Sequence, residues 1–397
     1  MSEKIKLLII GDGVTPTGFS RVLHSVAKNL SLDIYDISWL AVNYFGDPHI
    51  YPNYTIYPAT GGEHQDAYGF SKLSFVLGTV KPDVIFLLND IWIIDAYLDA
   101  LKQIYQGKEK PKIVVYFPVD AEDHQPEWYR HVDYVDSMYT YTEFGKRVAE
   151  KACPDTRFRV APHGTDNSMF YKIEDRTKEE IRAELFPKYP DLWSEDLFYI
   201  LNGNRNQPRK RLDVTLRAFA MFAKGKDDVK LYLHTGMVDS HVHIPALVKT
   251  LGIVDKLTIS STYSGVQKAS VEKLNKIYNA CNVGVNTCVG EGWGLVNNEH
   301  AITGAPQIVP NHSALADIYA DCGVLVDPIM DFTLDTVPTT GKLCRPDDIA
   351  EGMQLLYGDR ELLADLSKKS IAKFTSEKYT WEYVASIFDK RIRELVG

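Results

Sequence analysis

The sequence is short of cysteine, of long apolar runs and of positive charge. Its five cysteines in 397 residues lie far apart and form no Cys-X-X-Cys pair, so neither a disulfide framework nor a zinc cluster is indicated. The N-terminal apolar run is too short for a signal peptide, and the stretch DVIFLLNDIWII is interrupted by Asn89 and Asp90. We therefore expect a soluble, cytoplasmic protein without a membrane span.

Two further absences narrow the function. The formal net charge is −9, whereas proteins that bind nucleic-acid backbones usually carry a basic surface, so nucleic acid is disfavoured as a partner. No Asp-X-Asp occurs in the chain, which argues against a metal-dependent sugar transferase, because such an enzyme needs a carboxylate cluster or a pair of this kind. We expect no metal site and no cofactor.

What the chain does contain is two successive series of strand-like and helix-like segments. Such alternation predicts parallel sheets covered by helices, and 397 residues suffice for two domains. The polar stretch 174–195 is typical of a connection between them. The pattern predicts an α/β protein of two Rossmann-like, doubly wound domains, over residues 1–185 and 195–378. An interdomain cleft lined by helix N-termini would suit a phosphorylated ligand.

The first loop between a strand and a helix, GDGVTPTGF, is rich in glycine but does not match a dinucleotide fingerprint. Gly11, Gly13 and Gly18 are spaced unlike GxGxxG, and Pro16 interrupts them. Gly18 would let the backbone approach a bound sugar or phosphate, although an ordinary turn explains these glycines equally well.

The segment LNGNRNQPRKRLDVTL gathers cations where a strand-like run gives way to a helix. After Gly203 come Arg205, Arg209, Lys210 and Arg211. A guanidinium and an ammonium group can grip a pyrophosphate from two sides and stabilise the charge that grows on it as it leaves. The alternative is a solvated basic turn.

The segment VGEGWGLVNNEHAITGAP holds two carboxylates beside a glycine-rich loop. A helix is expected to begin near Leu295, so Glu299 lies one turn inside it. At about 1.5 Å rise per residue, its carboxylate lies on the order of 6 Å from the helix start, where a ribose would sit if phosphates bound the N-terminus. Glu291, in the loop, would face the sugar. A glycosidase pair, with carboxylates about 5 to 10 Å apart, is also possible, but the neighbouring cations have no role in hydrolysis.

Taken together, these segments make the chain resemble the GT-B glycosyltransferases of glycosyltransferase family 4, which are retaining enzymes that use nucleotide-sugar donors. The resemblance rests on EGWGLVNNE, GNRNQPRK, VAPHGTDNSMF, GAPQIVP and YTWEYVASIF. The patterns NRN…RKRLD and YNAC are similar to glycosyltransferases encoded by some large viruses, which allows a viral origin. The family implies metal-independent transfer, a donor domain over 195–378, and a last helix, 381–397, that crosses back onto the N-terminal, acceptor-side domain.

The resemblance also implies roles for individual residues. Arg205 and Lys210 would hold the donor pyrophosphate. Glu299 would bind the ribose hydroxyls, and Glu291 the transferred sugar. The residues whose backbone would approach or donate to the donor are Gly18, Gly203, Gly292, Trp293, Gly294 and Leu295.

One position departs from the family pattern. Family members commonly carry a His after the strand that reads KIVVYF here, where it contacts the donor sugar, whereas this chain has Pro118, Val119 and Asp120. Asp120 is the candidate to take over that contact, and the alternative is that it caps the structure locally.

The sequence therefore predicts a hexosyl or pentosyl transferase. It would move a sugar from a nucleoside diphosphate sugar to a hydroxyl of a glycan, a protein or another acceptor, with retention of configuration. The residues expected in catalysis are Glu291, Arg205, Lys210 and Asp120. Two alternatives remain: a non-catalytic nucleotide- or glycan-binding module of the same fold, and a transferase that glycosylates nucleic-acid bases.

Overall fold

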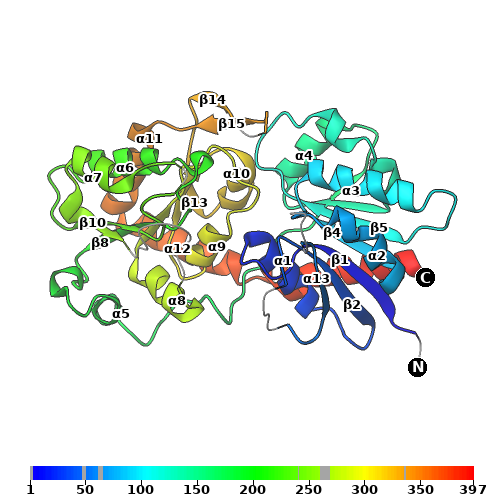
Figure 1. Ribbon diagram of the computed structural model, residues 1–397. Helices are drawn as coiled ribbons and strands as arrows, with labels where there is room; N and C mark the ends of the chain where they lie inside the picture. The colour runs from blue at the N-terminus through cyan, green and yellow to red at the C-terminus, as the bar shows by residue number, and fades with distance from the viewer. Residues whose placement is uncertain (1–2, 47–50, 61–65, 240, 260–268, 335–336) are drawn as a thin grey trace. The chain divides into compact units, whose positions relative to one another are not determined.

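The computed structural model shows a chain that divides into two compact units (Figure 1). It describes residues 3–46, 51–60, 66–239, 241–259, 269–334 and 337–397. The first unit comprises Met1–Val119, Asp123–Gly164 and Trp381–Gly397, and the second comprises Asp120–Glu122 and Thr165–Thr380. The stretch 174–195, expected to connect two domains, therefore lies inside the second unit.

The first unit is built on a parallel sheet. Its described residues form seven strands in the order β3-β2-β1-β4-β5-β6-β7. This is the Rossmann order, in which the chain starts in the middle of the sheet, builds to one edge and then returns to build toward the other. The strands are β1 (Ile5–Asp12), β2 (Tyr35–Val42), β3 (Thr55–Pro58), β4 (Val84–Leu88), β5 (Lys112–Phe117), β6 (Ser137–Thr140) and β7 (Phe158–Val160).

Helices cover both faces of this sheet, so its central strand β4 is apolar throughout. All residues of β4 are buried, and successive side chains serve opposite faces. Ile85 and Leu87 join the core formed with α2, α3 and α4, whereas the ring centroid of Phe86 lies 4.9 Å from that of Phe388. The helices are α1 (Gly18–Lys28), α2 (Phe70–Val80), α3 (Ile91–Ile104) and α4 (Glu143–Ala152).

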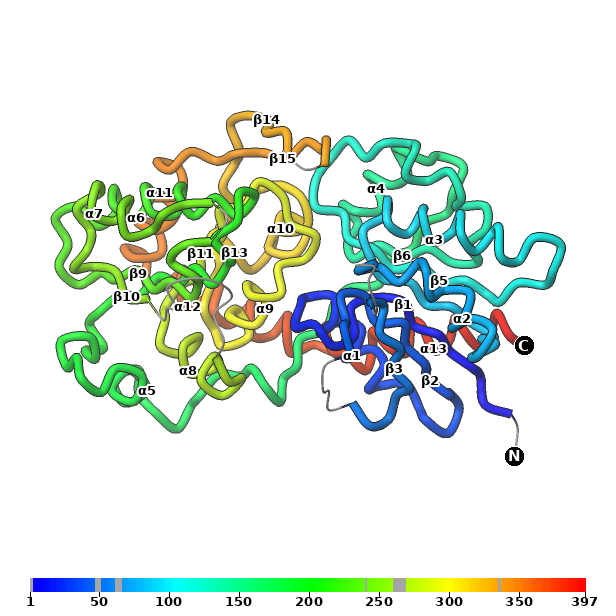
Figure 2. The backbone as a smooth tube through the Cα atoms, viewed as in Figure 1, coloured from blue at the N-terminus to red at the C-terminus, as the bar shows by residue number. Residues whose placement is uncertain are grey.

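The last helix, α13 (Trp381–Val396), belongs to the first unit and lies beside α1 (Figure 2). The ring of Phe388 meets that of Tyr116 edge-on, with centroids 5.0 Å apart. On the same helix, Asp389 accepts a hydrogen bond of 2.8 Å from the hydroxyl of Tyr35. Residues from the far end of the chain thus complete the core of the unit that forms its beginning.

The second unit repeats the plan. Its described residues form six parallel strands in the order β10-β9-β8-β11-β12-β13, and a separate antiparallel hairpin, β14-β15. The strands are β8 (Phe198–Asn202), β9 (Val229–Leu233), β10 (Leu257–Ile259), β11 (Val283–Val285), β12 (Gln307–Pro310), β13 (Gly323–Val326), β14 (Met330–Thr333) and β15 (Thr340–Leu343).

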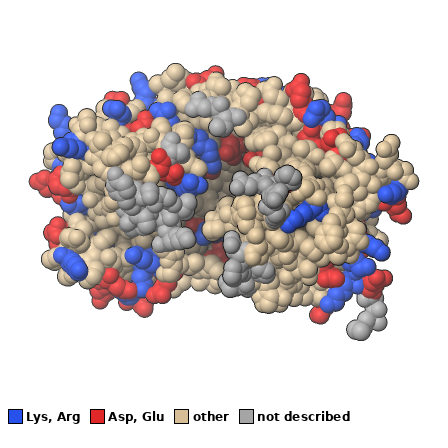
Figure 3. Space-filling view, in the orientation of Figure 1, with Lys and Arg blue, Asp and Glu red and all other residues tan. Residues whose placement is uncertain are grey.

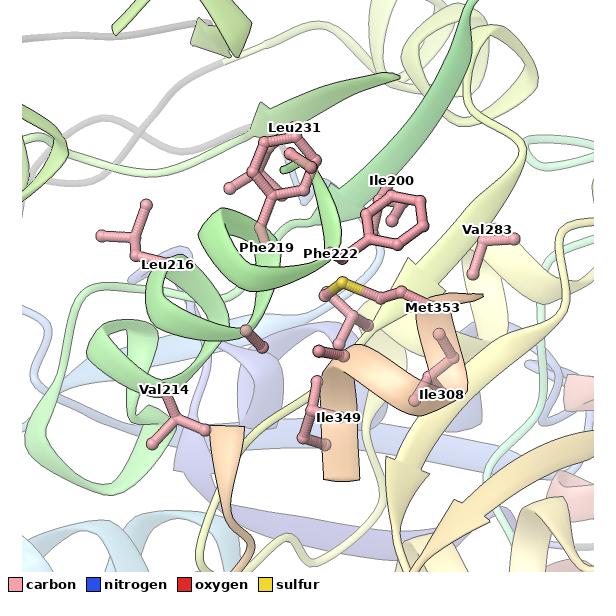
Figure 4. Packing of buried hydrophobic residues seen from close by; sticks show 14 of the residues in the cluster. Ile200, Val214, Leu216, Phe219, Phe222, Leu231, Val283, Ile308, Ile349 and Met353 are labelled. Atoms are coloured by element: carbon pink, nitrogen blue, oxygen red, sulfur yellow. The ribbon is translucent and has the colours of Figure 1, made fainter. Parts of the chain in front are cut away.

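Helices α6, α7 and α11 pack against one face of the second sheet. Phe219 of α6 and Met353 of α11 lie in one buried cluster with Ile200, Leu231 and Ile308 from the strands (Figure 4). Burying each such side chain contributes about 1.5 to 3 kcal/mol to folding. The helices are α5 (Lys178–Leu185), α6 (Leu212–Phe222), α7 (Ile244–Leu251), α8 (Val271–Ala280), α9 (Leu295–Ala301), α10 (Ser313–Tyr319), α11 (Pro346–Gly358) and α12 (Arg360–Phe374).

A buried cation anchors α5 to the second unit. The side chain of Arg182 is fully buried, and its guanidinium donates to the carbonyl oxygen of Ala280 at 2.8 Å and to the side-chain oxygen of Asn282 at 3.2 Å. Lys178 donates to the carbonyl oxygen of Cys281 at 3.0 Å. These carbonyls lie at and just beyond the C-terminal end of α8, where the helix dipole favours positive charge.

The surface carries both signs of charge. On the face shown in Figure 3, Lys and Arg side chains are interspersed with Asp and Glu side chains. Some pair along helices, as Lys369 and Asp365 do at 2.7 Å. Every helix among the described residues is too short or too polar to span a bilayer.

Candidate functional site

The strand order of the second sheet reverses between β8 and β11. In parallel α/β sheets, ligands bind outside the carboxyl ends of the strands at such a reversal, because the loops that follow the two strands diverge there. The loop after β8, residues 203–211, contains the 3₁₀ turn Pro208–Lys210 and leads into α6, and the loop after β11, residues 286–294, leads into α9. Both loops carry residues that the sequence singled out.

Buried polar groups tie these two loops together. The side-chain amide of Asn202, at the end of β8, donates to the hydroxyl of Thr215 in α6, and that hydroxyl also bonds to the hydroxyl of Thr287, each at 2.8 Å. The backbone N–H of Val289 donates to the carbonyl oxygen of Arg209 at 2.9 Å. The two loops are therefore fixed relative to each other.

Lys210 and Glu291 form a buried ion pair between the loops. Only 9% of each side chain is exposed, and the Lys210 ammonium donates to Oε2 of Glu291. Nη1 of Arg209 lies 3.5 Å from Oε1 of the same carboxylate and donates to the carbonyl oxygen of Gly290 at 3.1 Å. The backbone N–H of Glu291 donates to the hydroxyl of Ser313 at 3.1 Å. Both carboxylate oxygens and the backbone of Glu291 are thus held.

A second carboxylate, that of Asp120, completes this charge cluster of Asp120, Arg209, Lys210 and Glu291. Oδ2 of Asp120 lies 3.6 Å from Nη1 of Arg209. The close approach requires glycine at 290, because a Cβ there would lie 2.5 Å from the carbonyl oxygen of Asp120. Two cations and two carboxylates therefore meet at one place.

The surroundings shift the pKa values of the two carboxyl groups in opposite directions. Burial alone would raise the pKa of Glu291, but the charges of Lys210 and Arg209 and their hydrogen bonds lower it to about 2. For Asp120 burial prevails, and it raises the pKa above the ordinary value although Arg209 opposes it. On acidification, Asp120 is therefore the first of the two to take up a proton.

Glycine allows α9 to start close to the neighbouring loop. Gly294 has φ of 87°, a left-handed conformation that side chains disfavour, and it directly precedes Leu295, the first residue of α9. Its carbonyl oxygen accepts from the N–H of Asn297 at 3.0 Å. A Cβ on Gly203 would lie 2.7 Å from Cγ1 of Val296 in the first turn of the helix.

Glu299 lies inside α9 and is 4% exposed. The hydroxyl of Tyr278, from α8, donates to its carboxylate at 3.0 Å. The ring of Tyr278 stacks on that of His300, with centroids 5.5 Å apart. Burial lowers the pKa of His300 to about 3, so this ring is neutral near pH 7. A neighbouring helix thus orients the Glu299 carboxylate through a neutral donor.

Other residues expected in the site lie outside the ion pairs of the charge cluster. Arg205 has half of its side chain exposed and pairs with Asp239 at 3.3 Å. Trp293 is turned inward, 4% exposed, with its ring centroid 6.1 Å from that of Tyr379. Gly18 is the first residue of α1, in the first unit.

Three contributors had no individual role in the sequence interpretation. Arg209 is one of several neighbouring cations, and the resemblance implies the pyrophosphate contact for Arg205 instead. Tyr278 belongs to the run YNAC, which supports the resemblance to viral glycosyltransferases but does not indicate a contact with Glu299. Ser313, shortly after β12, has a left-handed backbone with φ of 55°. A serine in the sequence does not indicate that conformation.

The cluster offers groups for binding an anion and hydroxyls rather than metal ligands. Cations and backbone amides can hold phosphate oxygens, and the remaining lone pairs of the carboxylates can accept from sugar hydroxyls. Across the part of the chain that the structure describes, no three His, Cys, Asp or Glu side chains stand where they could share a metal ion.

Known structures share this fold, although the sequence matches no protein-family model and no curated protein. Sucrose-phosphate synthase from Thermosynechococcus elongatus is similar with a TM-score of 0.74 at 15% identity, over 99% of each chain. A glycosyltransferase from Rickettsia africae gives 0.72 at 12% identity, over 100% of this chain and 99% of that chain. HepE from Anabaena, in complex with UDP and glucose, gives 0.69 at 13% identity, over 98% and 99%.

These neighbours are GT-B glycosyltransferases. The expected fold class, α/β with two Rossmann-like units, is confirmed by the two sheets and by this likeness over whole chains.

Proposed function

We propose that this protein is a retaining glycosyltransferase that moves a hexosyl or pentosyl group from a nucleoside diphosphate sugar to a hydroxyl acceptor, without a metal ion. One observation carries the proposal: Lys210 and Arg209 meet Glu291 at the strand reversal of the second sheet. Cations beside hydroxyl-accepting carboxylates fit a ligand that is anionic at one end and hydroxylated at the other. A neutral glycoside would give the cations no role.

The likeness to HepE supports the donor class. That protein was solved with UDP and glucose, which are the two parts of such a donor. We extend the donor class to this chain because its own loop 203–211 brings two cations, Arg209 and Lys210, to the carboxylate of Glu291 in the loop after β11.

In the proposed reaction, the bond between the anomeric carbon and the diphosphate oxygen breaks while the acceptor oxygen bonds to the same carbon from the same face. The proton of the acceptor hydroxyl passes to the departing diphosphate. Lys210 and Arg205 stabilise the negative charge that develops on the leaving group. Glu291 accepts from hydroxyls of the sugar, and Glu299 from those of the ribose. No protein nucleophile takes part.

Lys210 can serve the diphosphate without leaving Glu291. An ammonium group has three N–H donors, and the ion pair with Glu291 uses one of them. The pair holds the cation in place before the donor arrives, so little reorganisation is needed when charge develops on the leaving group.

The test is a screen for nucleoside diphosphate release from UDP-, GDP- and ADP-sugars, with and without acceptor sugars. We expect turnover of at least one donor, and we expect Lys210→Met to lower it by about 100-fold or more. The same substitution leaves Glu291 buried without its cation, which costs about 3 to 5 kcal/mol of stability.

A double variant separates the two effects. Lys210→Met combined with Glu291→Gln removes both charges, so most of the stability should return while turnover stays low. Turnover close to that of the unaltered protein in Lys210→Met would contradict the proposal, as would failure of every nucleotide sugar to bind.

A further inference from the structure

Asp120 holds groups that an incoming anion would otherwise use. Oδ2 of its carboxylate lies 3.6 Å from Nη1 of Arg209. The same nitrogen lies 3.5 Å from Oε1 of Glu291, so one guanidinium group bridges two carboxylates. The other cation of the cluster, Lys210, is paired with Glu291.

The cluster has an enclosed part and an open part. The side chains of Lys210 and Glu291 are each 9% exposed, whereas those of Asp120 and Arg209 are 34% and 33% exposed. Asp120 and Arg209 are therefore the members of the cluster that solvent reaches most. Asp120 presents carboxylate oxygen atoms, which accept hydrogen bonds from hydroxyls and repel other carboxylates.

We propose, on the basis of the function above, that Asp120 selects donors whose sugar is uncharged and excludes donors whose sugar carries a carboxylate. A neutral sugar donates hydroxyl hydrogen bonds to Asp120 and Glu291. A uronic acid brings a third carboxylate beside those of Asp120 and Glu291, and the like charges repel it. Such a repulsive group gives specificity by weakening the wrong complex.

The experiment is calorimetric titration of the full chain with UDP, UDP-glucose and UDP-glucuronate, which needs no acceptor and no turnover. We expect UDP-glucose to bind about tenfold more tightly than UDP-glucuronate, or better. In Asp120→Asn, which keeps the size of the side chain and removes its charge, we expect this ratio to fall by about fivefold or more while UDP still binds.

Glu122→Gln is the matched control. Glu122 lies two residues along the same segment, exposes 37% of its side chain and pairs with Lys342 at 3.5 Å, outside the charge cluster. Its substitution should leave the ratio unchanged.

The outcomes are distinguishable. If UDP binds but UDP-glucose and UDP-glucuronate bind with equal affinity, the role of Asp120 is overturned and the proposed function stands. The same holds if the affinity ratio is unchanged in Asp120→Asn. If GDP binds and UDP does not, the same comparison is made with GDP-mannose and GDP-mannuronate in place of UDP-glucose and UDP-glucuronate, and the same outcomes decide. If no nucleotide or nucleotide sugar binds, the proposed function fails and this inference fails with it.

Discussion

At the scale of single residues, the two glutamates of the site are held in different ways. Glu291 faces two cations that lower the pKa of its carboxyl group to about 2. Glu299 accepts a hydrogen bond from the neutral phenol of Tyr278. A carboxylate oriented by a hydroxyl donor has further lone pairs that can accept from the hydroxyls of a ligand. Tyr278 is therefore expected to position Glu299 for the ribose.

Replacing Tyr278 by Phe removes this hydroxyl and leaves the ring. We expect the KM for the donor to rise about three- to tenfold, because a hydrogen bond to a charged group contributes about 1.5 to 3 kcal/mol at most and part of it is regained from water. The kcat should change little, since the ribose does not react. Steady-state kinetics with a fixed acceptor separate the two constants.

Tyr319→Phe provides the comparison. The Tyr319 hydroxyl donates to the side-chain oxygen of Asn298 at 2.6 Å, on the residue next to Glu299 in α9. Both variants should lose about 1 kcal/mol of stability. An equal rise in KM for both would mean that loosening of α9, and not the orientation of Glu299, causes the effect.

The sequence could place Lys210 and Glu291 at one edge of a sheet, because each follows an apolar strand-like run and parallel strands end on the same side. It could not tell which of the neighbouring cations meets the carboxylate. That choice depends on the turn Pro208–Lys210 and on the left-handed backbone of Arg211, with φ of 50°. The roles given to Arg205, Glu299 and the backbone amides stay predictions.

At the scale of elements, α5 shows how a polar segment becomes part of a core. Residues 174–195 look like a connection because they are rich in charge and contain prolines. The structure buries Arg182 there, and its guanidinium donates to the carbonyl oxygen of Ala280, the last residue of α8. Composition cannot reveal a buried cation whose partners are backbone groups more than ninety residues away.

Arg182→Met should loosen α5 from the second unit. The substitution leaves buried carbonyl oxygens without their donor, which costs about 1 to 3 kcal/mol. Amide hydrogen exchange over residues 178–185 should speed up correspondingly, and this local measurement avoids assuming that a chain of two units unfolds in one step.

Arg176→Met is the control for charge. Arg176 pairs with Glu184 of the same helix at 2.7 Å, with 30% of its side chain exposed. Exposed ion pairs contribute about 0 to 1 kcal/mol, so exchange in α5 should barely change. Equal acceleration in both variants would contradict the anchoring role of Arg182.

At the scale of the whole molecule, each unit contains a buried histidine with a strongly lowered pKa. Burial lowers the pKa of His163, in the first unit, to about 3, and it has the same effect on His300 in the second. In the unfolded chain a histidine has a pKa of about 6.5. Between these values the unfolded state binds a proton that the folded state does not, so stability falls as the pH drops below about 6.5.

Thermal unfolding measured at pH 7, 6 and 5 should therefore show a progressive fall in Tm. Each of these histidines costs about 2 kcal/mol at pH 5 relative to neutral pH. His300→Gln should lose stability at pH 7 but lose less on going to pH 5 than the unaltered protein does. A Tm that stays constant between pH 7 and pH 5 would contradict this account.

The overall architecture was the most predictable feature, because alternating apolar strands and amphipathic helices follow from local periodicity. It was harder to predict from the sequence which segments belong to which unit. Asp120–Glu122 belongs to the second unit although the residues on either side belong to the first. Contacts between residues far apart in sequence decide such membership, and a single sequence does not display them.

The position of α13 has a consequence for synthesis. A ribosome delivers β4 and β5 early, yet Phe388, which packs against Phe86 and Tyr116, follows only after the whole second unit has been translated. At typical elongation rates this delay is on the order of tens of seconds. Throughout that interval an apolar face of the nascent sheet lacks its natural cover, so the half of the protein that is begun first is finished last.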